Sequence, residues 1–170
     1  MRALLLTLYL LLMGAAVLNS ATADELLQPK ADGWHTWQVD EPGASTEMCC
    51  YTWNRGSKNR GAGCDLDGNN ISFSDGADCG AVAGTMQIYV RLDAGIPEDI
   101  RVLSSNCPVS TETAVTDHGL QSVTDNIDWF RSIIEDRKLD HDVREEALFA
   151  LVLSGSDAAY VYLDNLLTQR

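Results

Sequence analysis

The chain contains five cysteines, which can take part in more kinds of chemistry than its other residues. A cysteine can close a disulfide, hold a metal ion or act as a nucleophile. The chain contains no Cys-x-x-Cys pair, so the usual motif of thioredoxin-like redox sites is missing. We therefore interpret the five as disulfide candidates: Cys49, Cys50, Cys64, Cys79 and Cys107.

The pairing of these cysteines stays open at the level of sequence. An odd number leaves one thiol over, unless the adjacent Cys49 and Cys50 bond each other. Neighbours on a strand point to opposite faces of the sheet, so we expect Cys49 and Cys50 to take different partners from among the other three. Cys79 lies in a stretch rich in glycine and aspartate, which makes it our candidate for the odd cysteine.

The stretch 65–70, Asp-Leu-Asp-Gly-Asn-Asn, has features of a calcium loop. Oxygen ligands at alternate positions can converge on one cation. However, the glycine stands at the fourth place of the loop instead of the sixth, and the twelfth place is Gly76, which has no carboxylate. We prefer an Asx-rich turn between strands and predict no metal site, with calcium binding as an alternative.

The three histidines are far apart in the sequence: His35, His118 and His141. They show no spacing typical of zinc ligands. Cysteine–histidine catalysis needs the two side chains within hydrogen-bond reach, and no sequence pattern indicates such a pair. We interpret His141 as a residue at a helix N-terminus, and we predict no catalytic residue and no cofactor.

Four aromatic residues near the start of the chain suggest a platform for sugar rings: Trp34, Trp37, Tyr51 and Trp53. On a regular strand, however, Trp34 and Trp37 face opposite sides, whereas Tyr51 and Trp53 share one face. Aromatic residues on half-buried strands more often pack in the core. Core packing is therefore our interpretation, and a glycan site is the alternative.

The first 23 residues have the pattern of a cleaved secretory signal. Arg2 precedes an apolar stretch at 3–17, and Ala21-Thr22-Ala23 offers a small-x-small cleavage site. The apolar stretch is shorter than the roughly 20 residues of a membrane span. We expect a periplasmic or secreted protein, cleaved after Ala23, where disulfides persist. The formal net charge of the full chain, −13, does not favour binding to nucleic acid or to an anionic membrane surface.

The middle of the chain has β patterns. The clearest is TMQIYVRL at 85–92, where apolar and polar residues alternate. The full set of expected strands is 34–39, 48–53, 70–74, 85–92 and 100–104. We expect them to form a small antiparallel sheet, with Pro97 before the pairing begins, because proline cannot donate to a ladder. The polar stretch 111–121 is interpreted as a linker to the helices.

The C-terminal end has helical patterns on both sides of Gly155, which suits the left-handed position that ends a helix. Asp142 and Glu145 are spaced as a capping box, and Ser156 can cap the next helix. The first helix should bury Val143, Ala147, Ala150, Leu151 and Ser154. The second should bury Ala159, Tyr162, Leu163 and Leu166, with Leu167 alongside.

An upstream segment repeats the second helix. Trp129-Phe130 and Ile133-Ile134 precede Tyr162-Leu163 and Leu166-Leu167 by 33 residues each, a period typical of helical repeats. We therefore expect a helix at 124–137, capped by Thr124 or Asp125. An ordinary helical hairpin with chance spacing is the alternative. Because one and a half repeats cannot bury a continuous core, this end should pack on the preceding segment.

Four segments together resemble a family: MCCYTW, CDLDG, VLSSNCPV and DHDVREEALFALVLSG. They are similar to bacterial exported HEAT-repeat proteins with the short, phycobilisome-lyase-like repeat. The resemblance runs from about Trp34 to the C-terminus, and Cys79 lies outside the matching stretches. It implies helix surfaces that bind other proteins, and it implies no established activity.

We therefore expect an α+β fold in which a small antiparallel disulfide-tied β-sheet packs against a C-terminal HEAT-like helical hairpin and one preceding helix. The expected units are a signal peptide at 1–23, a cysteine-containing β segment at 24–117 and a helical segment at 118–170. The expected function is non-enzymatic binding of a protein partner. Its predicted surface comprises Trp129, Arg131, Arg144, Glu145 and Tyr160. The alternatives are a small exported enzyme or thiol protein using an unpaired cysteine, and a calcium or glycan binder.

Overall fold

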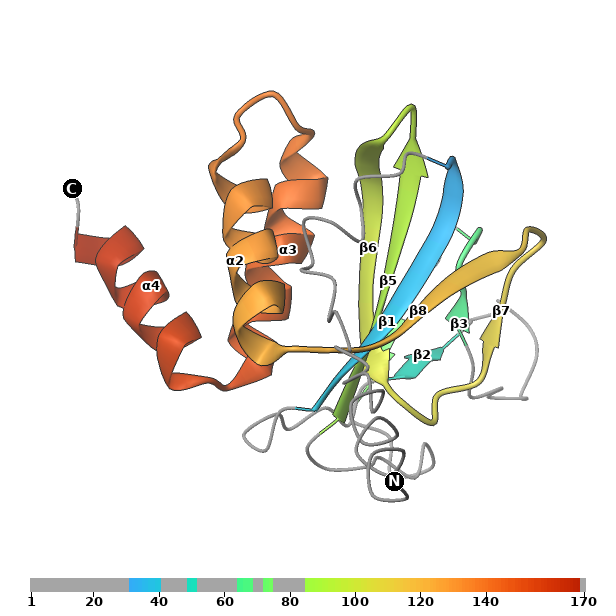
Figure 1. The fold of residues 1–170 in the computed structure, drawn as a ribbon, viewed down its shortest axis with the longest axis horizontal. Helices are drawn as coiled ribbons and strands as arrows, with labels where there is room; N and C mark the ends of the chain where they lie inside the picture. The colour runs from blue at the N-terminus through green and yellow to red at the C-terminus, as the bar shows by residue number, and fades with distance from the viewer. Residues whose placement is uncertain (1–30, 41–48, 52–63, 69–71, 75–84, 169–170) are drawn as a thin grey trace, which may run out of the picture.

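The chain has an α+β fold built from a four-stranded mixed sheet, two small two-stranded sheets and three C-terminal helices (Figure 1). The structure is a computed structural model, and it describes residues 31–40, 49–51, 64–68, 72–74 and 85–168. The signal segment and Cys79 lie outside the described residues. Within the described part of the chain, none of the helices is long and apolar enough to cross a membrane.

The main sheet has the strand order β6-β5-β1-β8. Its members are β1 (Gly33–Asp40), β5 (Thr85–Asp93), β6 (Ile96–Ser104) and β8 (Val115–Gln121). β1 pairs antiparallel with β5, and β5 pairs antiparallel with β6 through a tight turn at Ala94 and Gly95, which both have positive φ. The strands expected at 34–39, 85–92 and 100–104 are confirmed.

Two expectations about this sheet were wrong. Pro97 lies inside β6 opposite Leu92, next to a register shift, and not before the pairing. β6 is an edge strand, where a residue without an N–H is tolerated.

The stretch expected to be a linker contains β8, which pairs in parallel with β1 and makes the sheet mixed instead of antiparallel. β8 is the other edge strand and is largely exposed, so its sequence lacks the alternation that marks a half-buried strand. A register shift between Thr36 and Gln38, and Gly119 at a φ of 69°, interrupt the pattern further.

Two small sheets lie beside the main sheet, on the side away from the helices (Figure 1). β2 (Cys49–Tyr51) pairs antiparallel with β4 (Ser72–Ser74), and β3 (Cys64–Asp65) pairs in parallel with β7 (Val109–Ser110). Of the strands expected at 48–53 and 70–74, the described residues 49–51 and 72–74 are strands, and the other positions lie outside the described residues. β3 and β7 were not expected, because two-residue strands leave no periodic pattern.

The helices are α2 (Val123–Glu135), α3 (His141–Ser154) and α4 (Asp157–Thr168). Gly155 has a φ of 64° at the C-terminus of α3, and the Ser156 hydroxyl accepts the Ala159 N–H at 3.1 Å, as expected. The cap of α3 is Asp140 and not Asp142, because the Asp140 carboxylate accepts the Asp142 N–H at 2.9 Å. α2 begins at Val123, one residue earlier than expected, so the expected caps Thr124 and Asp125 lie inside the helix and that prediction was wrong.

Sheet and helices share one hydrophobic core. Trp37 and Trp129 meet edge to face with ring centroids 5.2 Å apart, and the buried Phe130 packs against Trp129. The Trp37 indole donates to the Asn126 side chain at 3.1 Å, and both residues are fully enclosed. The helical end therefore packs on the preceding segment, as expected from the incomplete set of repeats.

The buried face of α3 matches the expectation at all five positions. In α4 only Ala159 and Tyr162 are buried, whereas Leu163 is partly exposed and Leu166 is 41% exposed, so the expected burial of Leu163 and Leu166 was wrong. Helix α4 packs on α3 and projects away from the sheet (Figure 1), and its last turns have less of the protein to pack on.

Candidate functional site

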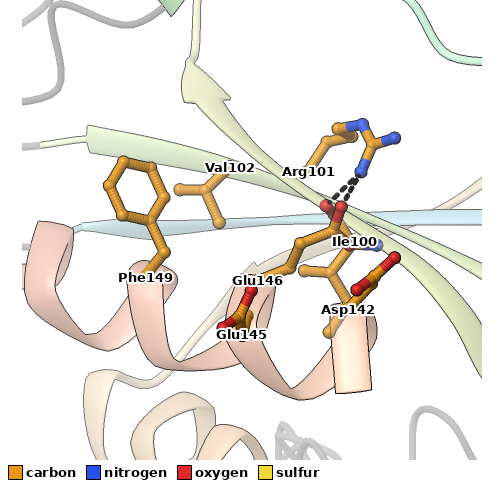
Figure 2. Close-up of a pocket in the computed structure, with 7 residues that line it drawn as sticks. All are labelled: Ile100, Arg101, Val102, Asp142, Glu145, Glu146 and Phe149. Carbon is orange, nitrogen blue, oxygen red and sulfur yellow. Dashed lines mark hydrogen bonds and ion pairs between the residues drawn. The ribbon is translucent and has the colours of Figure 1, made fainter. Parts of the chain in front are cut away.

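A groove lies between the edge strand β6 and helix α3. It has a volume of about 430 Å³, and we call it the β6–α3 groove (Figure 2). Its seven lining residues are Ile100, Arg101, Val102, Asp142, Glu145, Glu146 and Phe149. Three are apolar, three are acidic and one is basic. Figure 2 shows Val102 and Phe149 together at one end, with the carboxylates further along the helix.

The spacing of residues on α3 explains how the groove acquires its acidic side. Residues three and four apart share one face of a helix, so Asp142, Glu145, Glu146 and Phe149 project together. The buried residues of α3 occupy a different side and face the core. On the opposite wall, β6 is the edge strand of the main sheet among the described residues, and its outer edge borders the groove.

Glu146 connects the two walls. One of its carboxylate oxygens accepts the backbone N–H of Ile100 at 2.8 Å, and the other pairs with the Arg101 guanidinium. Because the Ile100 N–H donates to Glu146 on α3, it points away from β5, toward the open edge of the sheet. Glu146 therefore satisfies a backbone group of an edge strand, which would otherwise be open to pairing with another chain.

Arg101 is held between two carboxylates. Its guanidinium donates to the Asp99 carboxylate at 2.9 Å and also pairs with Glu146. Only 11% of the Arg101 side chain and 15% of the Asp99 side chain are exposed. Burial raises the pKa of Asp99 to about 6, because Arg101 and Arg91 only partly offset the burial and the Glu146 charge adds to it.

The charges of the groove do not balance. Arg101 is already paired with Asp99 and Glu146, while Asp142 and Glu145 add two further carboxylates with largely exposed side chains. Among the described residues, the ion-pair contacts of Asp142 and Glu145 are with His141, whose ring nitrogen lies 3.9 Å from Asp142 and 3.7 Å from Glu145 and which compensates charge only when protonated. The groove can therefore attract a cation, and it combines this charge with apolar walls.

The loop predicted as an Asx-rich turn has that form. The Asp65 carboxylate accepts the Asp67 N–H at 3.2 Å. The Asp67 carboxylate accepts from Thr111, from the Trp34 indole at 2.9 Å and from the Glu112 N–H. These hydrogen bonds lower the pKa of Asp67, and the one from Thr111 has the largest effect. Asp67 thus ties the turn to β1, and Asn69 and Asn70 lie outside the described residues.

The structure brings two of the three histidines together. The Nδ1 atom of His35 lies 3.0 Å from the Nε2 atom of His118, and the rings are stacked. The other nitrogen of His35 bonds the Ala31 carbonyl at 2.8 Å. This contact could not be predicted from the sequence, because the two histidines are far apart in the chain and meet only when β8 pairs with β1. His141 lies at the N-terminus of α3, as expected.

The histidine pair predicts a pH effect on stability. Burial, with the neighbouring His35 charge, lowers the pKa of His118 below 6.5, and Asp117 opposes this shift. The folded state therefore binds the proton less readily than the unfolded state, so stability is lost as pH falls below about 6.5. Denaturation from pH 8 to 5 should show wild type losing stability relative to His118→Gln. A constant difference between the two would contradict this, and the exposed His141→Gln variant is the control.

Of the four aromatic residues near the start of the chain, Trp34 and Trp37 belong to the core, and the side chain of Tyr51 is not described. Trp34 and Trp37 are each 1% exposed and face opposite sides of the sheet, as expected, toward Asp67 and toward Asn126. Trp53 lies outside the described residues.

Three of the predicted interaction residues have structural contacts. Trp129 is buried in the core. Arg131 pairs with Asp128 and lies over the Tyr162 ring, and Arg144 donates to the Ile134 carbonyl at 3.0 Å. The other two are exposed but lie apart: Glu145 lines the groove and Tyr160 is on α4. Only Glu145 therefore belongs to the β6–α3 groove.

Sequence reasoning missed most of the groove, including Arg101, Glu146 and Phe149. One signal was present, because these acidic and aromatic residues of α3 fall outside its predicted buried face. The contribution of β6 has no signal in the sequence.

No protein-family model matches this chain, and comparison with curated proteins and with solved structures likewise finds no match. The HEAT-repeat resemblance therefore rests on the segments and the spacing in the sequence itself.

Proposed function

We propose that this is an exported, non-enzymatic protein that binds another protein through its helical end, with the β6–α3 groove as the contact site. The observation that carries the proposal is the groove itself. It joins apolar walls to an uncompensated acidic side at the edge of a sheet, and such concave sites suit a polypeptide partner.

The helical end has a further exposed apolar surface, on α4, which lies outside the proposed contact site. On α4, Tyr160, Val161 and Leu167 are 56%, 63% and 72% exposed. The HEAT-like interpretation accounts for part of this exposure. Ile133 and Ile134 of α2 are buried, whereas Leu166 and Leu167, 33 residues later, are exposed, and a short stack whose last repeat has no neighbour would leave such residues uncovered.

Export is part of the proposal and is supported by the signal pattern at 1–23. N-terminal sequencing of the protein from its native compartment should begin at Asp24, and a retained Met1 would contradict cleavage. Cys64 and Cys107 are both buried in the β segment, and an exported protein would reach compartments where disulfides persist.

We propose that disulfides tie the β segment together. Mass-spectrometric mapping of the non-reduced protein tests this, and five reduced cysteines would rule it out. Titration of native thiols tests the rival reading of a thiol enzyme, which requires a reactive free cysteine.

The binding proposal is tested by capture from an exported fraction. Immobilised wild-type protein should retain a partner that Glu145→Arg does not retain, because the variant reverses a charge in the groove. Asp164→Arg makes the same change on the exposed side of α4 and should retain the partner. The proposal fails if wild type retains nothing better than Glu145→Arg.

A further inference from the structure

We infer that the β6–α3 groove receives a lysine or arginine side chain carried by an extended segment of the partner. This inference rests on the proposed function and names the chemistry of the bound segment. Lysine and arginine combine a long apolar stem with a cationic tip. The groove offers apolar side chains for the stem in one place and carboxylates for the tip in another.

The apolar stem has a matching wall. Phe149 is 43% exposed, lies beside Val102 (Figure 2) and offers most of the accessible apolar surface, because the lining residues Ile100 and Val102 are only 2% and 6% exposed. Methylene groups placed against these side chains leave water, and an aromatic face also attracts a cation that passes over it. In the same place, the charged end of an acidic side chain would make neither the apolar contact nor the attraction to the aromatic face.

The cationic tip has a matching charge. Arg101 is balanced by Asp99 and Glu146, so Asp142 and Glu145 remain as negative charge at the groove. The formal net charge of −13 for the whole chain favours the same sign of partner. An anionic segment would be repelled both by the carboxylates of the groove and by the net charge of the whole chain. We therefore favour a basic segment.

The backbone of β6 favours an extended segment. In an antiparallel ladder the outward-facing backbone groups recur every second residue. Ile100 uses its N–H outside the sheet, so the N–H and C=O of Val102 face the same outer edge. Because Glu146 occupies the edge at Ile100, a segment that pairs at Val102 cannot continue along the edge past Ile100, and it must be short.

The test uses the mature protein and capped pentapeptides that alternate valine and threonine around a central lysine, arginine, norleucine or glutamate. Amide NMR titration should show the lysine and arginine peptides shifting the signals of Val102 and Phe149. We expect norleucine to weaken binding about fivefold to tenfold, and we expect no binding of the glutamate peptide. Raising the salt concentration should weaken binding of the two basic peptides.

Matched variants locate the charge that is recognised. Asp142→Asn and Glu145→Gln should each weaken the lysine peptide by roughly two- to fivefold, because they remove exposed carboxylates. Asp164→Asn removes one carboxylate from α4 and should leave the affinity unchanged. Because the substituted side chains are exposed, circular dichroism should show the wild-type fold for all three.

Two results would overturn the inference. One is equal binding of the lysine and norleucine peptides, and the other is a set of shifts confined to α4. Either result leaves the capture experiment with Glu145→Arg unaffected, so failure of the basic-side-chain inference can be told from failure of the proposed function.

Discussion

Replacing Arg101 with methionine should lower the free energy of unfolding by roughly 2–4 kcal/mol at pH 7. The guanidinium lies between Asp99 and Glu146 with little exposure, so its removal leaves two carboxylates close together without a cation. The Ile100 carbonyl also loses a donor at 2.9 Å. Urea denaturation at fixed pH measures the effect. Arg131→Met removes an exposed arginine and should cost under about 1 kcal/mol.

The pH dependence of this loss identifies its cause. The pKa of Asp99 is already raised to about 6, so the folded state binds the proton more readily than the unfolded state. Protonation of Asp99 therefore adds stability as pH falls from above 6 toward 4. Without Arg101 the pKa should rise further, so the loss should be smaller at pH 5 than at pH 8. Asp99→Asn should recover part of the loss in the Arg101→Met background. An equal loss at both pH values would show that charge is not the cause.

Replacing Trp37 with alanine should cost about 3–5 kcal/mol of stability, the range for removing a large aromatic side chain from a core. The substitution removes the edge-to-face contact with Trp129 and leaves the buried Asn126 carbonyl without its indole donor. Chemical denaturation measures the loss. Leu167→Ala, at an exposed position of α4, should stay within about 0.5 kcal/mol of wild type.

The same experiment tests whether sheet and helices form one cooperative unit. Because Trp37 on β1 packs against α2, the helical signal in circular dichroism and the tertiary signal of the sheet should be lost in a single transition. Helical signal that persists after the sheet has unfolded would show that the helical end is an independent domain.

Some elements could be predicted from the sequence because the cause of their structure is local. The alternation in β5 and the 3.6-residue pattern of α3 each reflect one buried face, and Gly155 marks the end of α3 because its φ is positive. The cap of α3 was misplaced by two residues, since Asp140 and Asp142 can both act as an N-cap and only the backbone geometry distinguishes them.

Other elements could not be predicted because they depend on distant parts of the chain. β8 is recognisable only through its pairing with β1, and the contact between His35 and His118 follows from that pairing. The groove likewise needs β6 to be an edge strand and α3 to lie beside it. Leu166 was expected in the core because its helical position is inward, but α4 extends beyond the layer that would cover it.

The most direct test of the account is site-specific photo-crosslinking in the native compartment. A benzophenone side chain is placed at Phe149, which lines the groove, or at Val161, which is exposed on α4. The account predicts a discrete protein adduct from position 149, with a much weaker one from position 161. Adducts from position 161 alone, or none from either position, would contradict a partner bound between β6 and α3.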